Sequence, residues 1–289
     1  MKVATLITAF KLPLQLERML KAMEHPDFYF FIHIDKKIDI TLFTGLANLP
    51  RVTFIVNRVL CNWGGFSFVN AYLTALEEIL ESGEKFDFYN LMSGQDYPIK
   101  PMPQVAQFFA AHLGKNFISY DEEHEKDWWA HAVTRYEMYH FTDLKFKGKY
   151  FVQRILNTVA PKRKFPLPIK LYGSSDSSWW TITEESAKYL VDFRHKEVEL
   201  FKFMKYTWAP DEFLIATILM NSPFKHDVIN NNLRLISWQE GIANPKILKI
   251  EDFETLANSN KLFARKFDAN VDEEILAKLD EVMHSRKKE

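Results

Sequence analysis

The feature that most constrains the fold is a regular alternation of apolar runs and helical patterns along the first 115 residues. Apolar runs suited to buried strands lie at 3–8, 28–34, 52–56 and 86–92. Between and after them, apolar residues recur at helical spacing over 13–23, 66–80 and 105–113. Apolar strands separated by helices favour a mostly parallel sheet with helices on both faces. The sequence therefore predicts an α/β fold.

The rest of the chain is less regular but shows no break. Residues 120–170 are charged and irregular, which predicts a loop-rich insertion over the sheet edge. Further strands are expected at 179–183 and 233–238, and helices from 184, at 252–257 and at 271–284. Because no internal repeat or low-complexity linker is visible, we expect one continuous domain over 1–289.

Bulk composition disfavours several classes of protein. The formal net charge is −1, so a nucleic-acid partner is not indicated. The single cysteine, Cys61, excludes an internal disulfide and fits a reducing compartment, which predicts a cytoplasmic protein. The sequence has no apolar run of about 18 residues, so no membrane span is expected. The basic end at 286–288 is expected to be a solvated tail, with peripheral membrane contact as the weaker alternative.

Polar residues gather where the predicted strands end. Each of them alone has a plain alternative: Asp35 as a helix cap, or Gly64 as part of a turn. Ligands of parallel sheets nevertheless bind at the carboxyl ends of the strands. The residues that we expect at this edge are His33, Asp35, Arg58, Trp63, Gly64 and Asp96.

A second candidate site is the stretch 207–212, Thr-Trp-Ala-Pro-Asp-Glu. Pro210 suits the first position of a helix, and Asp211 and Glu212 would then lie in its first turn. A carboxylate at the edge of a buried helix is well placed to act as a general base. The alternative is that both acidic residues only stabilise the helix N-terminus.

Several familiar phosphate-binding motifs are missing. The chain has neither the dinucleotide-binding pattern Gly-x-Gly-x-x-Gly nor a P-loop, which disfavours a dehydrogenase or a P-loop enzyme. It also lacks Asp-x-Asp and any His/Cys cluster at zinc spacing. If a diphosphate binds here, lysine, arginine and backbone amides must meet its charge.

Together, the motifs resemble those of a known family. They are 32–36, 63–65, 93–100, 173–174 with 179–180, 209–212 and 262–268, in this order. The combination is similar to the core-2/I-branching N-acetylglucosaminyltransferases, a family that includes peptide O-xylosyltransferases, and soluble bacterial members look nearest. The resemblance covers roughly residues 1 to 285. It implies a GT-A fold and an inverting transferase that uses a UDP-sugar without a metal ion or other cofactor.

The resemblance also implies roles for individual residues. Residues 1–115 would form a nucleotide-binding half and 116–289 an acceptor and catalytic half. Glu212 would be the general base, and the departing diphosphate would be met by Arg234, Lys266 and Arg265. The nucleotide pocket would be lined by His33, Asp35, Arg58 and Asp96. Donor or acceptor contacts would come from Trp63, Gly64, Glu137, Asp176, Trp180 and Trp208.

Two alternatives stay open at this point. The vertebrate branching enzymes carry an aromatic acceptor-binding loop before the arginine that binds the diphosphate. Here only residues 221–233 precede the corresponding Arg234, and Trp238 comes after it. Either N-acetylglucosamine or xylose is therefore an acceptable donor sugar, with a hydroxyl of a glycan or glycoconjugate as acceptor. The competing interpretation is a catalytically silent sugar-binding protein on the same fold.

Overall fold

The largest sheet joins strands from both ends of the chain. The computed structural model describes residues 1–123, 127–239, 241 and 244–285. In this part of the chain the main sheet has seven strands, in the order β10-β6-β9-β4-β1-β2-β3. Their bounds are β1 Val3–Ala9, β2 Phe28–Ile34, β3 Val52–Phe54, β4 Phe88–Ser93, β6 Asn116–Ile118, β9 Trp180–Thr183 and β10 Val228–Asn230. Only β9 runs antiparallel to its neighbours, so the expectation of a mostly parallel sheet is confirmed.

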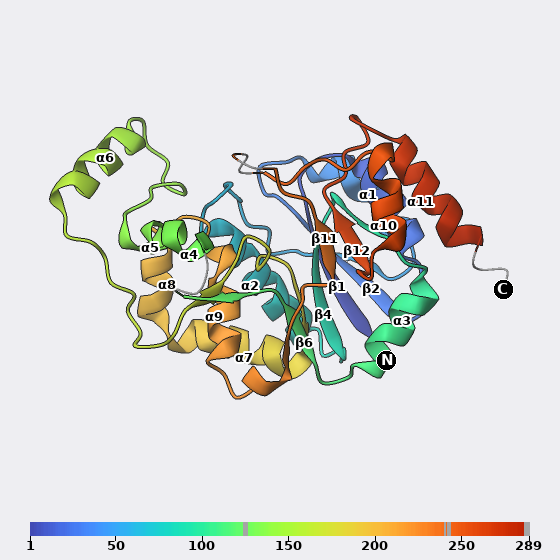
Figure 1. Ribbon diagram of the computed structural model, residues 1–289, viewed down its shortest axis with the longest axis horizontal. Coiled ribbons are helices and arrows are strands. Elements are labelled where there is room, and N and C mark those ends of the chain that lie inside the picture. The colour runs from blue at the N-terminus through green and yellow to red at the C-terminus, as the bar shows by residue number, and fades with distance from the viewer. Residues whose placement is uncertain (124–126, 240, 242–243, 286–289) are drawn as a thin grey trace.

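Helices cover both faces of this sheet (Figure 1). Strand β1 sends Ala4 and Leu6 into one apolar cluster and Val3 and Ile7 into the other, because side chains alternate along a strand. The first cluster is closed by α2 (Ser67–Glu81), α7 (Glu184–Lys196), α8 (Val198–Met204) and α9 (Leu214–Met220). The second is closed by α1 (Pro13–Ala22), α3 (Met102–Ala111), α10 (Phe253–Asn258) and α11 (Glu274–Ser285). The predicted α/β architecture with two helical layers is thus confirmed.

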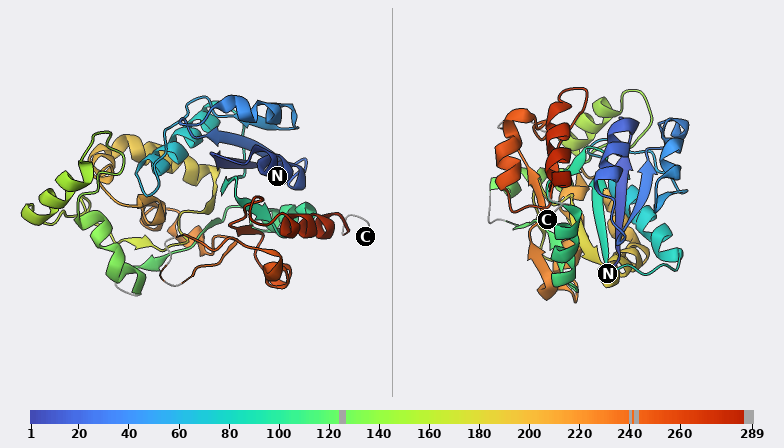
Figure 2. Two further views of the ribbon diagram at one scale, coloured as in Figure 1. Left: turned by 90° about the horizontal axis from the view of Figure 1, so that it is seen from above. Right: turned by 90° about the vertical axis from the view of Figure 1, so that its right-hand side faces the viewer.

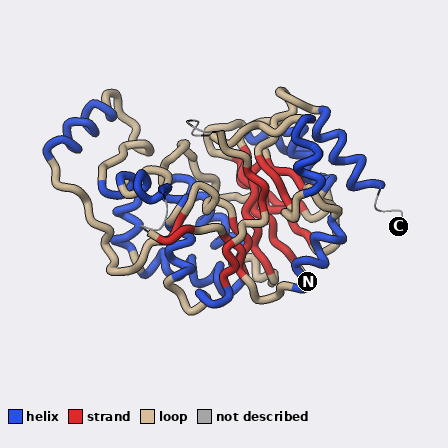
Figure 3. The backbone as a smooth tube through the Cα atoms, viewed as in Figure 1, coloured by secondary structure: helices blue, strands red, loops and turns tan. Residues whose placement is uncertain are grey.

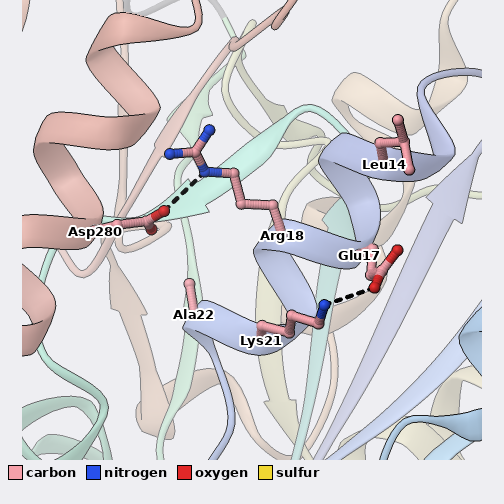
Figure 4. Close-up of a pocket in the computed structure, with 6 residues that line it drawn as sticks. All are labelled: Leu14, Glu17, Arg18, Lys21, Ala22 and Asp280. Atoms are coloured by element: carbon pink, nitrogen blue, oxygen red, sulfur yellow. Dashed lines mark hydrogen bonds and ion pairs between the residues drawn. The ribbon is translucent and has the colours of Figure 1, made fainter.

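Local sequence signals explain several element ends. Pro13 stands at the start of α1, where its missing N–H costs nothing. The hydroxyl of Thr183 accepts a hydrogen bond from the Ser186 N–H and so caps α7, as the sequence predicts. Helix α11 lies beside α10 in Figures 1 and 2. It is tied to α1 by the pair Arg18 Nε–Asp280 Oδ2 at 2.7 Å, which borders a shallow surface hollow (Figure 4).

A small second sheet brings the end of the chain to the carboxyl edge of the main sheet. It has the order β11-β12-β5, with β5 at Asp96–Pro98, β11 at Arg234–Ile236 and β12 at Phe263–Arg265. Strand β5 follows β4 almost directly, and its Asp96 pairs in register with Arg265. Sequences more than 160 residues apart therefore meet beside the ends of β1 and β4. The expectation of a strand at 233–238 is confirmed by β11, whereas β5 and β12 were not predicted.

The irregular region 120–170 contains short elements joined by loops (Figure 3). They are β7 (Asp121–Glu122), α4 (Asp127–Ala132), α5 (Thr134–Glu137) and α6 (Lys149–Val159). Strand β7 pairs with β8 (Tyr172–Gly173) and closes the insertion at its base. None of the described helices is long and apolar enough to cross a bilayer. The basic end at 286–288, expected to be a solvated tail, lies outside the described residues.

Candidate active site

A pocket of about 430 Å³ opens at the carboxyl ends of the parallel strands. Thr8 and His33 line it from the ends of β1 and β2, and Ser93 lines it from the end of β4. Such a position is where α/β sheets bind their ligands. The hollow between α1 and α11 (Figure 4) holds only aliphatic stems and ion pairs, so it offers no comparable convergence of polar groups.

The stretch 207–212 forms one wall of this pocket. The predicted helix start is a single 3₁₀ turn, Pro210–Glu212, and the α-helix begins only at Leu214. Ala209 has φ +43°, a strained value for a residue with a side chain, and its N–H donates to the Gly64 carbonyl at 2.7 Å. Because the turn is separate from α9, its carboxylates face the pocket instead of continuing a helix surface.

Two glycines let neighbouring segments approach this turn. A Cβ on Gly64 would lie 2.5 Å from the indole of Trp208, and one on Gly173 would lie 2.6 Å from the Glu212 carbonyl oxygen. Gly64 also has φ +69°, which favours glycine on its own. The Trp208 N–H donates to the Arg135 carbonyl at 3.0 Å, so the insertion holds the turn from a third side.

Two carboxylates, those of Glu212 and Asp211, stand in this wall. Glu212 Oε2 accepts a hydrogen bond from Arg135 Nη1 at 2.5 Å, and a fifth of its side chain remains exposed. Burial raises the pKa of Glu212 to about 7 although Arg135 opposes the rise. Asp211 accepts from Ser178 Oγ at 2.7 Å, and burial raises its pKa as well. Glu212 is thus poised to exchange a proton near neutral pH.

Besides Arg135, two further cations line the same pocket. Arg265 donates from Nε to Asp96 Oδ1 at 3.1 Å, and its guanidinium carbon lies 3.8 Å from the centre of the Trp179 ring. Lys266 follows it, and burial together with the nearby Arg265 and Lys11 lowers its pKa. Cations that are fixed by packing, with part of their charge unmet, are suited to bind an anionic ligand.

Arg234, which is expected to meet a diphosphate, is not among the described residues that line this pocket, and that role stays a prediction. It is 2% exposed, and burial lowers its pKa to about 10. Its guanidinium donates to Asn90 Oδ1, to the Leu91 carbonyl and to Thr181 Oγ1, which belong to strands β4 and β9 of the main sheet. Residue 234 points inward from β11, so the arginine cross-links two sheets.

Other predicted site residues also lie outside the described lining of the pocket. Arg58 donates to the carbonyls of residues 34, 35 and 38, and it thereby shapes the loop after β2. Asp96 is fully buried and orients Arg265, which makes it a positioning residue. Trp180 is a fully buried core residue. Glu137 pairs with Lys162, and Asp176 accepts from the indole of Trp238 at 2.8 Å.

The remaining predicted residues do line the pocket: His33, Asp35, Trp63, Gly64, Trp208, Glu212, Arg265 and Lys266. His33 Nε2 accepts from the Val59 N–H at 2.9 Å, and burial lowers its pKa, so the ring is neutral at pH 7. Asp35 accepts from the N–H groups of Lys37 and Cys61 and organises the same loop. Trp63 and Trp208 meet edge to face at 5.0 Å between ring centres.

Several pocket residues were missed by sequence reasoning. They are Arg135, Ser178, Trp179, Trp128 and Trp238. Trp128 and Arg135 belong to the irregular insertion, where no periodic pattern of apolar residues indicates which side chains face the protein interior. The pairing of Arg135 with an acidic residue 77 positions away is visible only once the chain is folded. The pocket thus combines the carboxylate of Glu212 with three cations and several indole faces, as an enzyme site for a polar, anionic ligand requires.

The chain belongs to the core-2/I-branching enzyme family, whose model matches residues 3–257. It is similar to xylosyltransferase 2 of Rattus norvegicus, with 28% identity over 294 residues that cover 92% of this chain and 32% of that protein. Identity to xylosyltransferase 2 of Homo sapiens is 29% over 296 residues, 92% of this chain and 32% of that protein. The chain therefore spans about a third of the length of these relatives.

One solved structure shows a distant likeness. The apo crystal structure of mouse xyloside xylosyltransferase 1 matches with a TM-score of 0.42 and 11% identity. The match covers 91% of this chain and 97% of that one.

Proposed function

We propose that this chain is a GT-A-type, inverting glycosyltransferase that moves a sugar from a UDP-sugar to a hydroxyl of a glycan or glycoconjugate. One observation carries the proposal: a single pocket holds Glu212, with a pKa near 7, together with the cations Arg265 and Lys266. Membership of the core-2/I-branching family supports the same reaction class.

Proton removal from the acceptor and stabilisation of the leaving group are assigned to different residues of the pocket. Glu212 accepts the proton of the acceptor hydroxyl while the hydroxyl oxygen bonds to the anomeric carbon. The bond from that carbon to the diphosphate oxygen breaks in the same step, and the electron pair leaves with UDP. A single displacement inverts the anomeric centre and needs no second carboxylate as nucleophile. A positioned base typically contributes about 10²–10⁴ in rate.

The diphosphate takes up negative charge as it leaves, and the proposal assigns that charge to Arg265 and Lys266. Asp96 and the Trp179 face hold the guanidinium of Arg265 in place, so it need not reorganise during the step. Burial lowers the pKa of Lys266, and the nearby cations Arg265 and Lys11 lower it further, so an arriving diphosphate would relieve that repulsion. These cations support a transfer that proceeds without a divalent ion.

Xylose is the donor sugar that we favour over N-acetylglucosamine, because the similar proteins carry the name xylosyltransferase. The indole faces of Trp63, Trp208 and Trp128 would stack on the apolar faces of donor or acceptor sugars.

Thermal unfolding in the presence of candidate donors tests the proposal. UDP-xylose, UDP-N-acetylglucosamine, UDP and UMP are compared in EDTA, since a ligand of the folded state raises the midpoint by mass action. We expect both UDP-sugars and UDP to raise it more than UMP, and UDP-xylose to support release of UDP when an acceptor is present. A rise with none of them, or only when a divalent ion is added, contradicts the proposal.

A further inference from the structure

Helix α6 turns its polar side toward the rest of the chain. Lys149, Gln153 and Asn157 are spaced four residues apart, so they share one side of the helix. Their side chains hydrogen-bond backbone groups of residues 139–144 at 2.7 to 3.0 Å. The helix is therefore anchored by polar contacts, whereas a surface helix normally packs its apolar stripe on the core.

The opposite side of α6 is apolar and faces solvent. Phe151, Ile155 and Val159 repeat at the same spacing, and they are 69%, 49% and 75% exposed. Val152, on the same side, is also exposed. Within α6, whose residues are all described, no residue is buried. A contiguous apolar stripe of this kind on a protruding element marks a contact surface.

The sequence around this stripe is strongly basic. Residues 144–164 contain no Asp or Glu, although the whole chain has a net charge of −1. Five basic residues of the segment are exposed, whereas Arg163 is buried and Lys149 donates to backbone carbonyls of the insertion. The exposed ones are Lys145, Lys147, Arg154, Lys162 and Lys164. Figures 1 and 2 show α6 at the end of the molecule that is farthest from α11, extended away from the sheet. The charge complement of this surface is anionic.

We propose that α6 and its basic flanks are a docking surface for an anionic lipid bilayer. Phe151, Ile155 and Val159 would enter the boundary between headgroups and acyl chains, while lysines on both flanks contact lipid phosphates. Apolar residues on one side of a helix with Lys and Arg beside them are the pattern of helices that lie in the bilayer interface. This inference goes beyond transfer chemistry and does not depend on it.

Sedimentation of the full chain with vesicles tests the inference. Phosphatidylcholine vesicles with and without phosphatidylglycerol are compared at low and high salt. We expect roughly tenfold tighter binding to the anionic vesicles, weakened by salt. The double substitution Phe151→Gln with Ile155→Gln should weaken that binding roughly tenfold or more, because the lost apolar groups no longer leave water.

The matched control is Leu42→Gln with Val271→Gln, which removes equally exposed apolar residues on other parts of the surface. It should bind vesicles like the wild type. Absence of wild-type binding to anionic vesicles overturns the inference, and so does equal loss in the control. Self-association that the Phe151 and Ile155 substitutions abolish, without any vesicle binding, also overturns it and identifies a protein interface.

Circular dichroism and the thermal midpoint check that these variants fold. Should the first pair fail to fold, Lys145→Gln with Lys147→Gln provides the second test, since both lysines are exposed and the apolar stripe is untouched. That pair should reduce the preference for anionic over neutral vesicles severalfold. An unchanged preference contradicts the proposed headgroup contact.

Discussion

Arg135 Nη1 lies 2.5 Å from Glu212 Oε2, and yet the pKa of Glu212 is raised to about 7. On its own, the positive charge of Arg135 would lower the pKa of Glu212, so that the carboxylate would stay ionised well below pH 7. Burial in the pocket outweighs it, because removing a carboxylate from water disfavours its charged form. The pair thus keeps Glu212 close to half ionised at neutral pH and fixes the direction of one oxygen. Arg135 is a positioning residue by this argument.

The pH dependence of transfer should report this pair. A base acts only when deprotonated, so kcat should rise with pH through about 7, the pKa of Glu212. Arg135→Met removes the group that lowers this pKa, so the rising limb should move to higher pH by about one unit or more. Arg135→Lys keeps the charge and should move it less. A limb that stays in place in Arg135→Met contradicts the assigned role.

The ionisation of Glu212 should also lower the stability of the fold at alkaline pH. Its pKa is raised from 4.5 to about 7, so the folded state binds more protons than the unfolded state between these values. The free energy of unfolding therefore falls as pH rises through that window, by at most about 3 kcal/mol. Glu212→Gln should be more stable than wild type at pH 8 and show little gain at pH 4. Urea titrations at the two pH values measure this, and an equal effect at both contradicts it.

Lys266→Ala should weaken UDP binding far more than uridine binding, because the proposed partner of the lysine is phosphate. Calorimetric titration with both ligands measures the difference, which we expect to be roughly tenfold or more for UDP. Lys36→Ala, an exposed lysine of the loop after β2, is the control and should change neither affinity. Equal losses for UDP and uridine in Lys266→Ala would indicate a distorted pocket instead.

Two glycines with similar backbones separate strain from crowding. Gly64 has φ +69° and Gly83 has φ +76°, so alanine costs about 1 kcal/mol of backbone strain at either position. Only at Gly64 does the new Cβ meet a neighbour, the Trp208 ring at 2.5 Å, which must then move. Gly64→Ala should raise KM for donor or acceptor severalfold, whereas Gly83→Ala should lower the thermal midpoint alone. Identical kinetics of the two variants contradict a role of Trp208 in the pocket.

The core of the fold could be predicted from the apolar runs of the sequence. Runs such as 28–34 are apolar on both sides, as a central strand with helices above and below must be. The stretch 207–212 could also be singled out, since Pro210 suits a helix start and the two acids after it suit a first turn. What could not be predicted was its conformation: the helix expected from Pro210 is interrupted at Phe213, whose φ of −148° separates the turn from α9.

The positions of the arginine side chains could not be predicted from the sequence. Arg234 and Arg265 both lie in short strands of the small sheet, and no local pattern tells which one faces inward. Arg234 lies opposite Phe263 of β12, and Arg265 follows two residues later opposite Asp96 of β5, so both side chains lie on one face of the small sheet. They differ in position along that face: Arg265 reaches Asp96 at the pocket, whereas Arg234 reaches Asn90 in the interior. Arg135, in the irregular insertion, carried no signal at all.

Release of UDP from UDP-xylose in EDTA, by wild type and by Glu212→Gln, tests the central claim most directly. The wild type should turn over without a divalent ion when an acceptor hydroxyl is supplied. Glu212→Gln should lose about 10²-fold or more in kcat while its affinity for UDP stays within a few fold, because the base contacts the acceptor and not the nucleotide. Full activity of Glu212→Gln, or wild-type turnover that depends strictly on Mn²⁺, would contradict the account.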